Sequence, residues 1–121
     1  MNDREHLPID LDPLLDRCLG DRGFAADLLD RFLQKLPERV ERLAAAALAL
    51  DTGEVAREAH TLRGSAMNLA AVDLVDAIDA LESAMDRPTG PSEALAALRA
   101  EAAELLDHKQ TLLACLRSGT P

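Results

Sequence analysis

The sequence predicts a small all-α domain, an antiparallel up-down-up-down four-helix bundle with a short additional N-terminal helix. Apolar residues recur at alternating intervals of three and four along four long segments, and no segment shows the alternation of a β-strand. Of the 121 residues, 48% are hydrophobic, and many of these are Ala or Leu, which permit close helix packing. Four long helices joined by short turns bury their apolar stripes by packing antiparallel. We therefore expect one bundle over residues 10–117, with flexible ends at 1–9 and 118–121.

The first predicted helix is short and spans about Asp12–Leu19. Asp12 suits the N-cap, and Pro13 suits the first helical position, where a proline loses no helical hydrogen bond. Its apolar face is formed by Leu14, Leu15, Cys18 and Leu19. Gly20 then closes the helix.

The second predicted helix begins at Asp21 or Gly23 and continues to Leu50. Pro37 interrupts it, and an interior proline removes one backbone hydrogen bond and crowds the preceding turn. The apolar stripe nevertheless keeps its phase on both sides of the proline. We therefore expect a bend near Leu33–Pro37 and continuation of the helix beyond it.

Three further helices follow. The turn at 51–53 precedes the third helix, with Asp51 or Thr52 as its N-cap. Its stripe loses phase near 68–71, and a fourth helix begins at Asp73. A proline- and glycine-rich break then leads to the last helix, which Ser92 caps and which reaches about Arg117.

The third helix contains the most informative residues of the chain. Its apolar stripe consists of Val55, Ala59, Leu62, Ala66 and Leu69. His60 lies roughly 140° from the centre of this stripe, so its imidazole is expected to face solvent. Gly64, one turn later, is unusual, because a glycine inside a helix costs about 0.5–1 kcal/mol relative to alanine. We interpret it as clearance that lets another protein approach the imidazole, while Arg63 places a positive charge beside the ring.

An exposed imidazole with open space and a cation nearby suits a histidine that accepts a phosphoryl group. The alternative is that His60 is an ordinary surface histidine and Gly64 has no functional reason. Spacing alone does not decide between the two interpretations.

The segment His60–Ser65 resembles the signature of histidine-containing phosphotransfer domains, which is His, any residue, Leu or Ile, Lys or Arg, Gly and a small residue. The resemblance extends from about Asp10 to Arg117 and includes the segment 32–37. It implies that His60 accepts a phosphoryl group from a receiver-domain aspartate and passes it to another receiver domain in a two-component phosphorelay. A hybrid sensor kinase is the implied partner, and Mg²⁺ is expected only on the receiver. One departure is Ala70, where the family usually has glycine.

The resemblance also suggests residues that assist His60. Family members often have a hydrogen-bonding residue on the next helix, and Glu82 occupies the matching position here, where its carboxylate would hold the imidazole Nδ1–H. A solvated surface glutamate is the alternative. The expected docking face for the partner comprises Ala56, Arg57, Met67, Phe32 and Lys35, and Arg57, Arg63 and Lys35 are expected to attract the acidic receiver.

The composition argues against several other functions. A net charge of −9 and the absence of Trp and Tyr disfavour nucleic-acid binding. No apolar run suggests a membrane span or signal peptide, so a cytoplasmic location is expected. There is no phosphate-binding loop for ATP, which predicts a phosphocarrier and not a kinase. No metal site or disulfide is expected from Cys18 and Cys115, and His6 and His108 are interpreted as surface residues.

Three other functions remain open at this point. The chain could be a non-catalytic helical binding module for a receiver domain. It could be the phosphoacceptor and dimerisation domain of a sensor histidine kinase, although Thr61 stands where such domains normally have an acidic residue. It could also be a helical bundle without chemistry. A phosphocarrier with its own four-helix core is expected to be a monomer.

Overall fold

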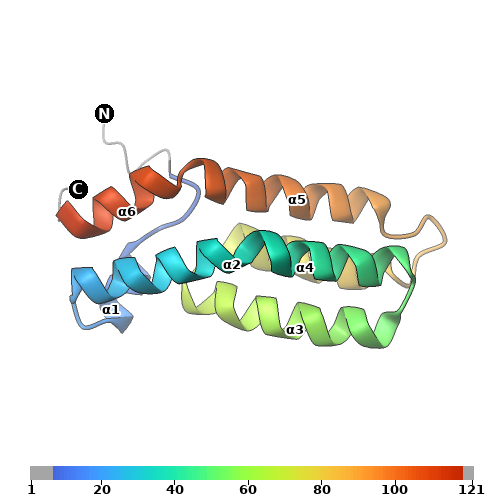
Figure 1. Ribbon diagram of the computed structural model, residues 1–121. Coiled ribbons are helices and arrows are strands. Elements are labelled where there is room, and N and C mark those ends of the chain that lie inside the picture. The colour runs from blue at the N-terminus through green and yellow to red at the C-terminus, as the bar shows by residue number, and fades with distance from the viewer. Residues whose placement is uncertain (1–6, 119–121) are drawn as a thin grey trace.

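The computed structural model describes residues 7–118, which form six helices and no strand (Figure 1). The helices are α1 (Asp12–Arg17), α2 (Arg22–Leu48), α3 (Thr52–Asn68), α4 (Val72–Ala84), α5 (Ser92–Asp107) and α6 (Lys109–Ser118). Among the main packing pairs are α2 with α3, α3 with α4, α4 with α5, and α5 with α2. These pairs close a ring of four helices in chain order, which confirms the predicted four-helix bundle. Of the ends predicted to be flexible, residues 1–6 and 119–121 lie outside the described residues. Within the described part, Ile9 is buried in the core, Leu7 packs against it, and Ser118 is the last residue of α6, so these three positions are ordered, in contrast to the prediction.

Helix α2 is the longest element and extends beyond α3 and α4 (Figure 1). Its N-cap is Asp21, whose carboxylate accepts a hydrogen bond of 3.0 Å from the Phe24 N–H. The helix continues through Pro37, as predicted, because the leucines on both sides of the proline are buried in the core. Helices α1 and α6 pack on α2, and α6 covers part of the α2 length that α4 does not reach.

The core consists almost entirely of leucine and alanine side chains, and no polar side chain of residues 7–118 is buried in it. The α3 residues Val55, Ala59, Leu62 and Ala66 are all within it, as the helical stripe predicts. Each buried leucine stabilises the fold by about 1.5–3 kcal/mol relative to an exposed one. This burial fixes the rotation of α3 about its axis and thereby the direction in which His60 points.

Two predicted helix caps are wrong. Leu11, and not Asp12, occupies the N-cap of α1, while the Asp10 carboxylate accepts a hydrogen bond of 3.0 Å from the Asp12 N–H. Pro91, and not Ser92, occupies the N-cap of α5, and no side chain caps this helix. In both cases the predicted cap, Asp12 or Ser92, is instead the first residue of the helix. A proline next to it has its φ fixed near the helical value, which favours the start of the helix at that position.

The predicted last helix is in fact two helices, α5 and α6, which are separated at His108. The backbone there departs from helical geometry, with ψ of 7°, and a ring nitrogen of His108 lies 2.9 Å from the Glu104 carbonyl oxygen. A side chain that bonds to this carbonyl competes with the backbone ladder. The sequence pattern conceals the break, because the buried Leu105 and Leu112 are seven residues apart, the spacing of a continuous helix.

Three helices end on non-glycine residues with positive φ: Leu19 (φ 55°), Leu50 (φ 56°) and Ala70 (φ 56°). After α3, the Ala70 N–H bonds to the Met67 carbonyl at 3.0 Å and the Ala71 N–H to the Ala66 carbonyl at 2.9 Å. This is the Schellman arrangement, in which a left-handed residue satisfies the last carbonyls of a helix. The turn predicted at 51–53 is accordingly displaced, because Leu50 makes the turn and Thr52 already belongs to α3. Similarly, α4 begins one residue before the predicted Asp73.

Candidate functional site

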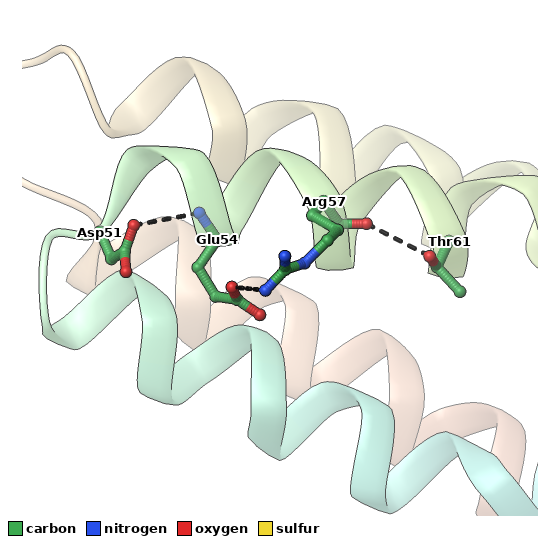
Figure 2. A network of polar contacts seen from close by, with 4 residues as sticks. All are labelled: Asp51, Glu54, Arg57 and Thr61. Carbon is green, nitrogen blue, oxygen red and sulfur yellow. Dashed lines mark hydrogen bonds and ion pairs between the residues drawn. The ribbon is translucent and has the colours of Figure 1, made fainter.

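The first half of α3 is fixed by a series of local polar contacts (Figure 2). The Asp51 carboxylate caps the helix by accepting a hydrogen bond of 3.1 Å from the Glu54 N–H, as predicted. Glu54 forms an ion pair with Arg57, and the Thr61 hydroxyl donates to the Arg57 carbonyl at 3.2 Å. These contacts join residues between Asp51 and Thr61, and none of them involves the imidazole of His60.

The His60 side chain is exposed, as predicted, and its ring forms no hydrogen bond or ion pair with residues 7–118. A Cβ built on Gly64 would meet no heavy atom of the described chain within 4 Å, apart from the helix's own nearby backbone. The glycine is therefore not required by packing. Its consequence is bare helix surface one turn from the imidazole.

Arg63 does not direct its charge at His60, in contrast to the prediction. Its Nε donates to Asp79 Oδ1 at 2.8 Å, and its Nη2 lies 3.5 Å from Asp79 Oδ2 on α4. The remaining Nη1 lies 3.1 Å from the sulfur of Met67. The hydrogen bond and the negative charge of Asp79 raise the pKa of the Arg63 guanidinium further above its usual value.

Glu82 is half-buried on α4 and forms no hydrogen bond or ion pair with His60 in the described structure. Its carboxylate contributes to the raised pKa of Arg63, so it lies within the electrostatic field of that residue. The antiparallel register of α3 and α4 places it at the level of His60 along the bundle. Arg63 faces Asp79 across the two helices. His60 lies one turn before Arg63 on α3, and Glu82 lies one turn after Asp79 on α4, so the two residues are at the same height along the antiparallel pair.

A groove of about 360 Å³ lies between α1, α2 and the C-terminal half of α3. Phe24, Leu28 and Phe32 give it an apolar wall, and the Ser65 and Asn68 side chains of α3 form its far edge. Four basic residues also line it: Arg17, Arg31, Lys35 and Arg39. A cationic surface is thus concentrated on one face of a protein whose net charge is −9.

The basic residues of the groove differ in their pairing. Arg17 donates to the Asn68 side-chain oxygen at 3.0 Å, which connects α1 to the end of α3. Arg31, Lys35 and Arg39 form no ion pair with any carboxylate among residues 7–118. Their charges remain available to an external anionic partner.

The predicted docking residues fall into two groups. Phe32 and Lys35 line the groove, whereas Ala56 and Met67 are exposed on α3 on the side of His60 that faces α4. Arg57 is exposed but occupied by Glu54. Since Ser65 lines the groove, the bare surface at Gly64 lies between the groove and the imidazole.

Sequence reasoning missed Asp79 and most of the groove. The groove had a detectable signal, because Phe24, Leu28 and Phe32 recur every four residues, and Arg31, Lys35 and Arg39 form a parallel row. Asp79 had none, because its role depends on the register between α3 and α4.

Within residues 7–118 no group of three His, Cys, Asp or Glu side chains is arranged to hold a metal ion. Cys18 is buried, Cys115 is half-buried, and both are free thiols. None of the helices in the described part of the chain has the length and apolarity needed to cross a bilayer.

Comparison with known proteins identifies the family to which the chain belongs. Residues 27–111, which include all of α3 and α4, match the Hpt domain family. Among solved structures, the HPT domain of the Hpt sensor hybrid histidine kinase from Shewanella has the same fold, with a TM-score of 0.56 and 23% identity over 92% of each chain. A search of curated protein sequences gives no match. The match to most of the sequence, together with the exposed histidine on α3, shows that the chain belongs to the Hpt domain family, the phosphocarrier domains of two-component phosphorelays that lack a kinase catalytic domain.

Proposed function

We propose that His60 accepts a phosphoryl group from the aspartyl phosphate of one receiver domain and passes it to the aspartate of a second. The observation that supports this most directly is the exposed imidazole of His60 beside the bare surface at Gly64. A hybrid sensor kinase with its own receiver domain is the proposed donor.

The chemistry requires little from this chain beyond placement. The lone pair of His60 Nε2 attacks phosphorus in line with the aspartyl oxygen, so an N–P bond forms, the O–P bond breaks and the aspartate carboxylate leaves. In the second transfer the N–P bond breaks, a new aspartyl O–P bond forms, and the electron pair returns to Nε2. The receiver supplies the Mg²⁺ that neutralises the transferring charge, and we propose that this chain contributes no metal or cofactor of its own.

Glu82 is proposed to orient the imidazole. It lies at the level of His60 on the neighbouring helix, and in this proposal rotation of either side chain brings the carboxylate to accept the Nδ1–H. This hydrogen bond would leave Nε2 unprotonated and facing solvent, which is the tautomer that the attack needs.

The groove is the proposed docking surface for the receiver. Its apolar wall, which includes Phe24 and Phe32, provides contact area, and the unpaired Arg31, Lys35 and Arg39 attract the acidic residues around a receiver's aspartate. Met67 and Ala56 extend the surface on the other side of His60. This arrangement allows one partner to cover the groove, Gly64 and the imidazole together.

Incubation with labelled, phosphorylated receiver domains tests the proposal. The protein should acquire an acid-labile phosphoryl label, and His60→Gln should abolish it while the helical circular dichroism is unchanged. His108→Gln is the matched control, because it makes the same change at the junction between α5 and α6 and should retain the label. Label that persists in His60→Gln, or its absence in the natural sequence with every receiver tested, would overturn the proposal.

Substitution of Gly64 tests the role of the bare surface separately. Gly64→Gln fits the open space in the free protein but should obstruct the receiver, so the transfer rate should fall at least about tenfold. Ala100→Gln, on the exposed surface of α5, is the control and should leave transfer unchanged. Equal transfer rates in the two variants would show that clearance at Gly64 is unnecessary.

The closed ring of α2, α3, α4 and α5 within one chain supports the proposal that the protein acts as a monomer. A phosphoacceptor domain of a sensor kinase would instead complete its bundle across a dimer. Sedimentation equilibrium distinguishes the two, since a dimer at micromolar concentration would favour the kinase alternative.

A further inference from the structure

Arg63 is held by two partners that both draw it away from His60. The Asp79 carboxylate binds its Nε and Nη2, and the Met67 sulfur lies next to its Nη1. Met67 is four residues after Arg63 along α3, whereas His60 is three residues before it. The guanidinium therefore points toward α4 and the C-terminal end of α3.

This direction is not the one that the helix itself favours. Side chains on an α-helix tilt toward its N-terminus, which for Arg63 means toward His60. The Asp79 carboxylate supplies the attraction that changes the direction. The Arg63 and Asp79 side chains are 40% and 46% exposed, so solvent weakens their ion pair and the guanidinium can exchange partners.

We propose that Asp79 is a positioning residue that withholds Arg63 from His60 and competes with the phosphoryl group for it. This inference rests on the proposed function of His60. A phosphoryl group on Nε2 carries close to two negative charges and three acceptor oxygens, so it attracts the guanidinium more strongly than one carboxylate does. The charge of Asp79, reinforced by Glu82, opposes this exchange.

The competition has a direct effect on the relay. If Arg63 were free to pair fully with the phosphoryl group, phospho-His60 would be more stable and a worse donor to the second receiver. By retaining part of the Arg63 interaction, Asp79 keeps the phosphohistidine high enough in free energy for onward transfer. Asp79 thus adjusts the equilibrium of transfer without contacting the reacting atoms.

The first experiment measures the lifetime and the transfer equilibrium of phospho-His60. The protein is loaded with phosphoramidate, whose N–P bond breaks with release of ammonia as the His60 N–P bond forms, and is then mixed with an unphosphorylated receiver. In Asp79→Asn and Asp79→Ala the phosphohistidine should live about two- to fivefold longer, and the equilibrium should shift toward His60 by a similar factor. Asp76→Asn is the control, because it makes the same charge change at an exposed α4 position and should shift neither.

The second experiment asks whether the effect passes through Arg63. In an Arg63→Gln background, Asp79→Asn should no longer change the lifetime, because there is no guanidinium to release. In NMR spectra of the natural sequence, the Arg63 Nε–H resonance should be protected before phosphorylation and should shift when His60 is loaded. A merely structural role for Asp79 would not produce this dependence on the phosphoryl group.

The outcomes separate this inference from the proposed function. If phosphoramidate and phosphorylated receivers both fail to load His60 in the natural sequence, the proposed function and the role of Asp79 are both overturned. If loading and transfer proceed but Asp79→Asn behaves like Asp76→Asn, only the role of Asp79 is overturned. The same conclusion follows if Asp79→Asn has an equal effect with and without Arg63.

Discussion

Replacing Ala70 with glycine should stabilise the protein, although the same change inside a helix is destabilising. Ala70 has a φ of 56° in the Schellman turn that ends α3. A left-handed conformation costs a residue with a Cβ about 1–2 kcal/mol, and glycine avoids this cost. Against this gain stand the greater flexibility of glycine in the unfolded chain, about 0.5–1 kcal/mol, and the loss of a half-buried methyl group. The expected net gain is about 0.5 kcal/mol.

A comparison with a second variant isolates the conformational contribution. Ala100→Gly, at an exposed position inside α5, carries the same flexibility cost but relieves no strain, so it should destabilise by about 0.5–1 kcal/mol. The difference between the two variants should therefore be about 1–2 kcal/mol. With an unfolding entropy of about 0.25 kcal/mol/K for a chain of this length, their Tm values should differ by about 4–8 °C.

Thermal unfolding followed by circular dichroism at 222 nm measures both variants. Ala70→Gly should unfold above the natural sequence by about 2 °C, and Ala100→Gly below it. Equal shifts in the two variants would refute the reasoning, since they would mean that position 70 carries no conformational strain. A lower Tm for Ala70→Gly than for Ala100→Gly would show that its methyl contacts are the larger effect.

Three further predictions concern pH, docking and stability. Burial, followed by the charges of neighbouring carboxylates, raises the pKa of Glu101 in the folded protein, so the folded state favours the protonated form of this residue. Protonated Glu101 therefore contributes to stability at low pH, and this contribution is lost as the pH rises above about 4.5 and the carboxylate becomes charged. Glu101→Gln should therefore raise the free energy of unfolding by up to about 0.5 kcal/mol at pH 7 and leave it unchanged near pH 3, as urea denaturation at the two values would show. Lys35→Glu should slow association with a receiver about tenfold at low salt, as stopped-flow measurements would show. Arg42→Glu makes the same charge change outside the groove and should have a much smaller effect. Equal effects of the two variants would contradict a docking role for the groove. Gly64→Ala should raise the free energy of unfolding by about 0.5–1 kcal/mol, because no packing contact requires glycine there; a lower value would mean that the helix itself needs it.

The features that depend on one helix were predictable from the sequence. The apolar stripe of α3 determines which face is buried, so the exposure of His60 and the open surface at Gly64 followed from spacing alone. The continuation of α2 through Pro37 followed from the unchanged phase of its stripe. The Asp51 cap was predictable because capping uses a backbone N–H only three residues away.

The features that depend on two elements were not predictable in the same way. Arg63 has a long side chain that reaches either His60 or the neighbouring helix, and only the register between α3 and α4 shows that Asp79 is within its reach. The break at His108 escaped detection because the apolar spacing is preserved across it. The Ala70 turn shows a related limit, since alanine favours helix locally while the bundle requires the chain to reverse there.

Both aromatic rings of the protein, Phe24 and Phe32, line the same groove, and the sequence contains no Trp or Tyr. Fluorine-labelled phenylalanine would therefore give a spectrum of two resonances, both located on the proposed docking surface. Arrival of a receiver could be followed by these signals alone, at any stage of loading, without altering a residue that takes part in transfer. The scarcity of aromatic residues, which leaves the protein nearly invisible at 280 nm, thus makes this surface unusually accessible to spectroscopy.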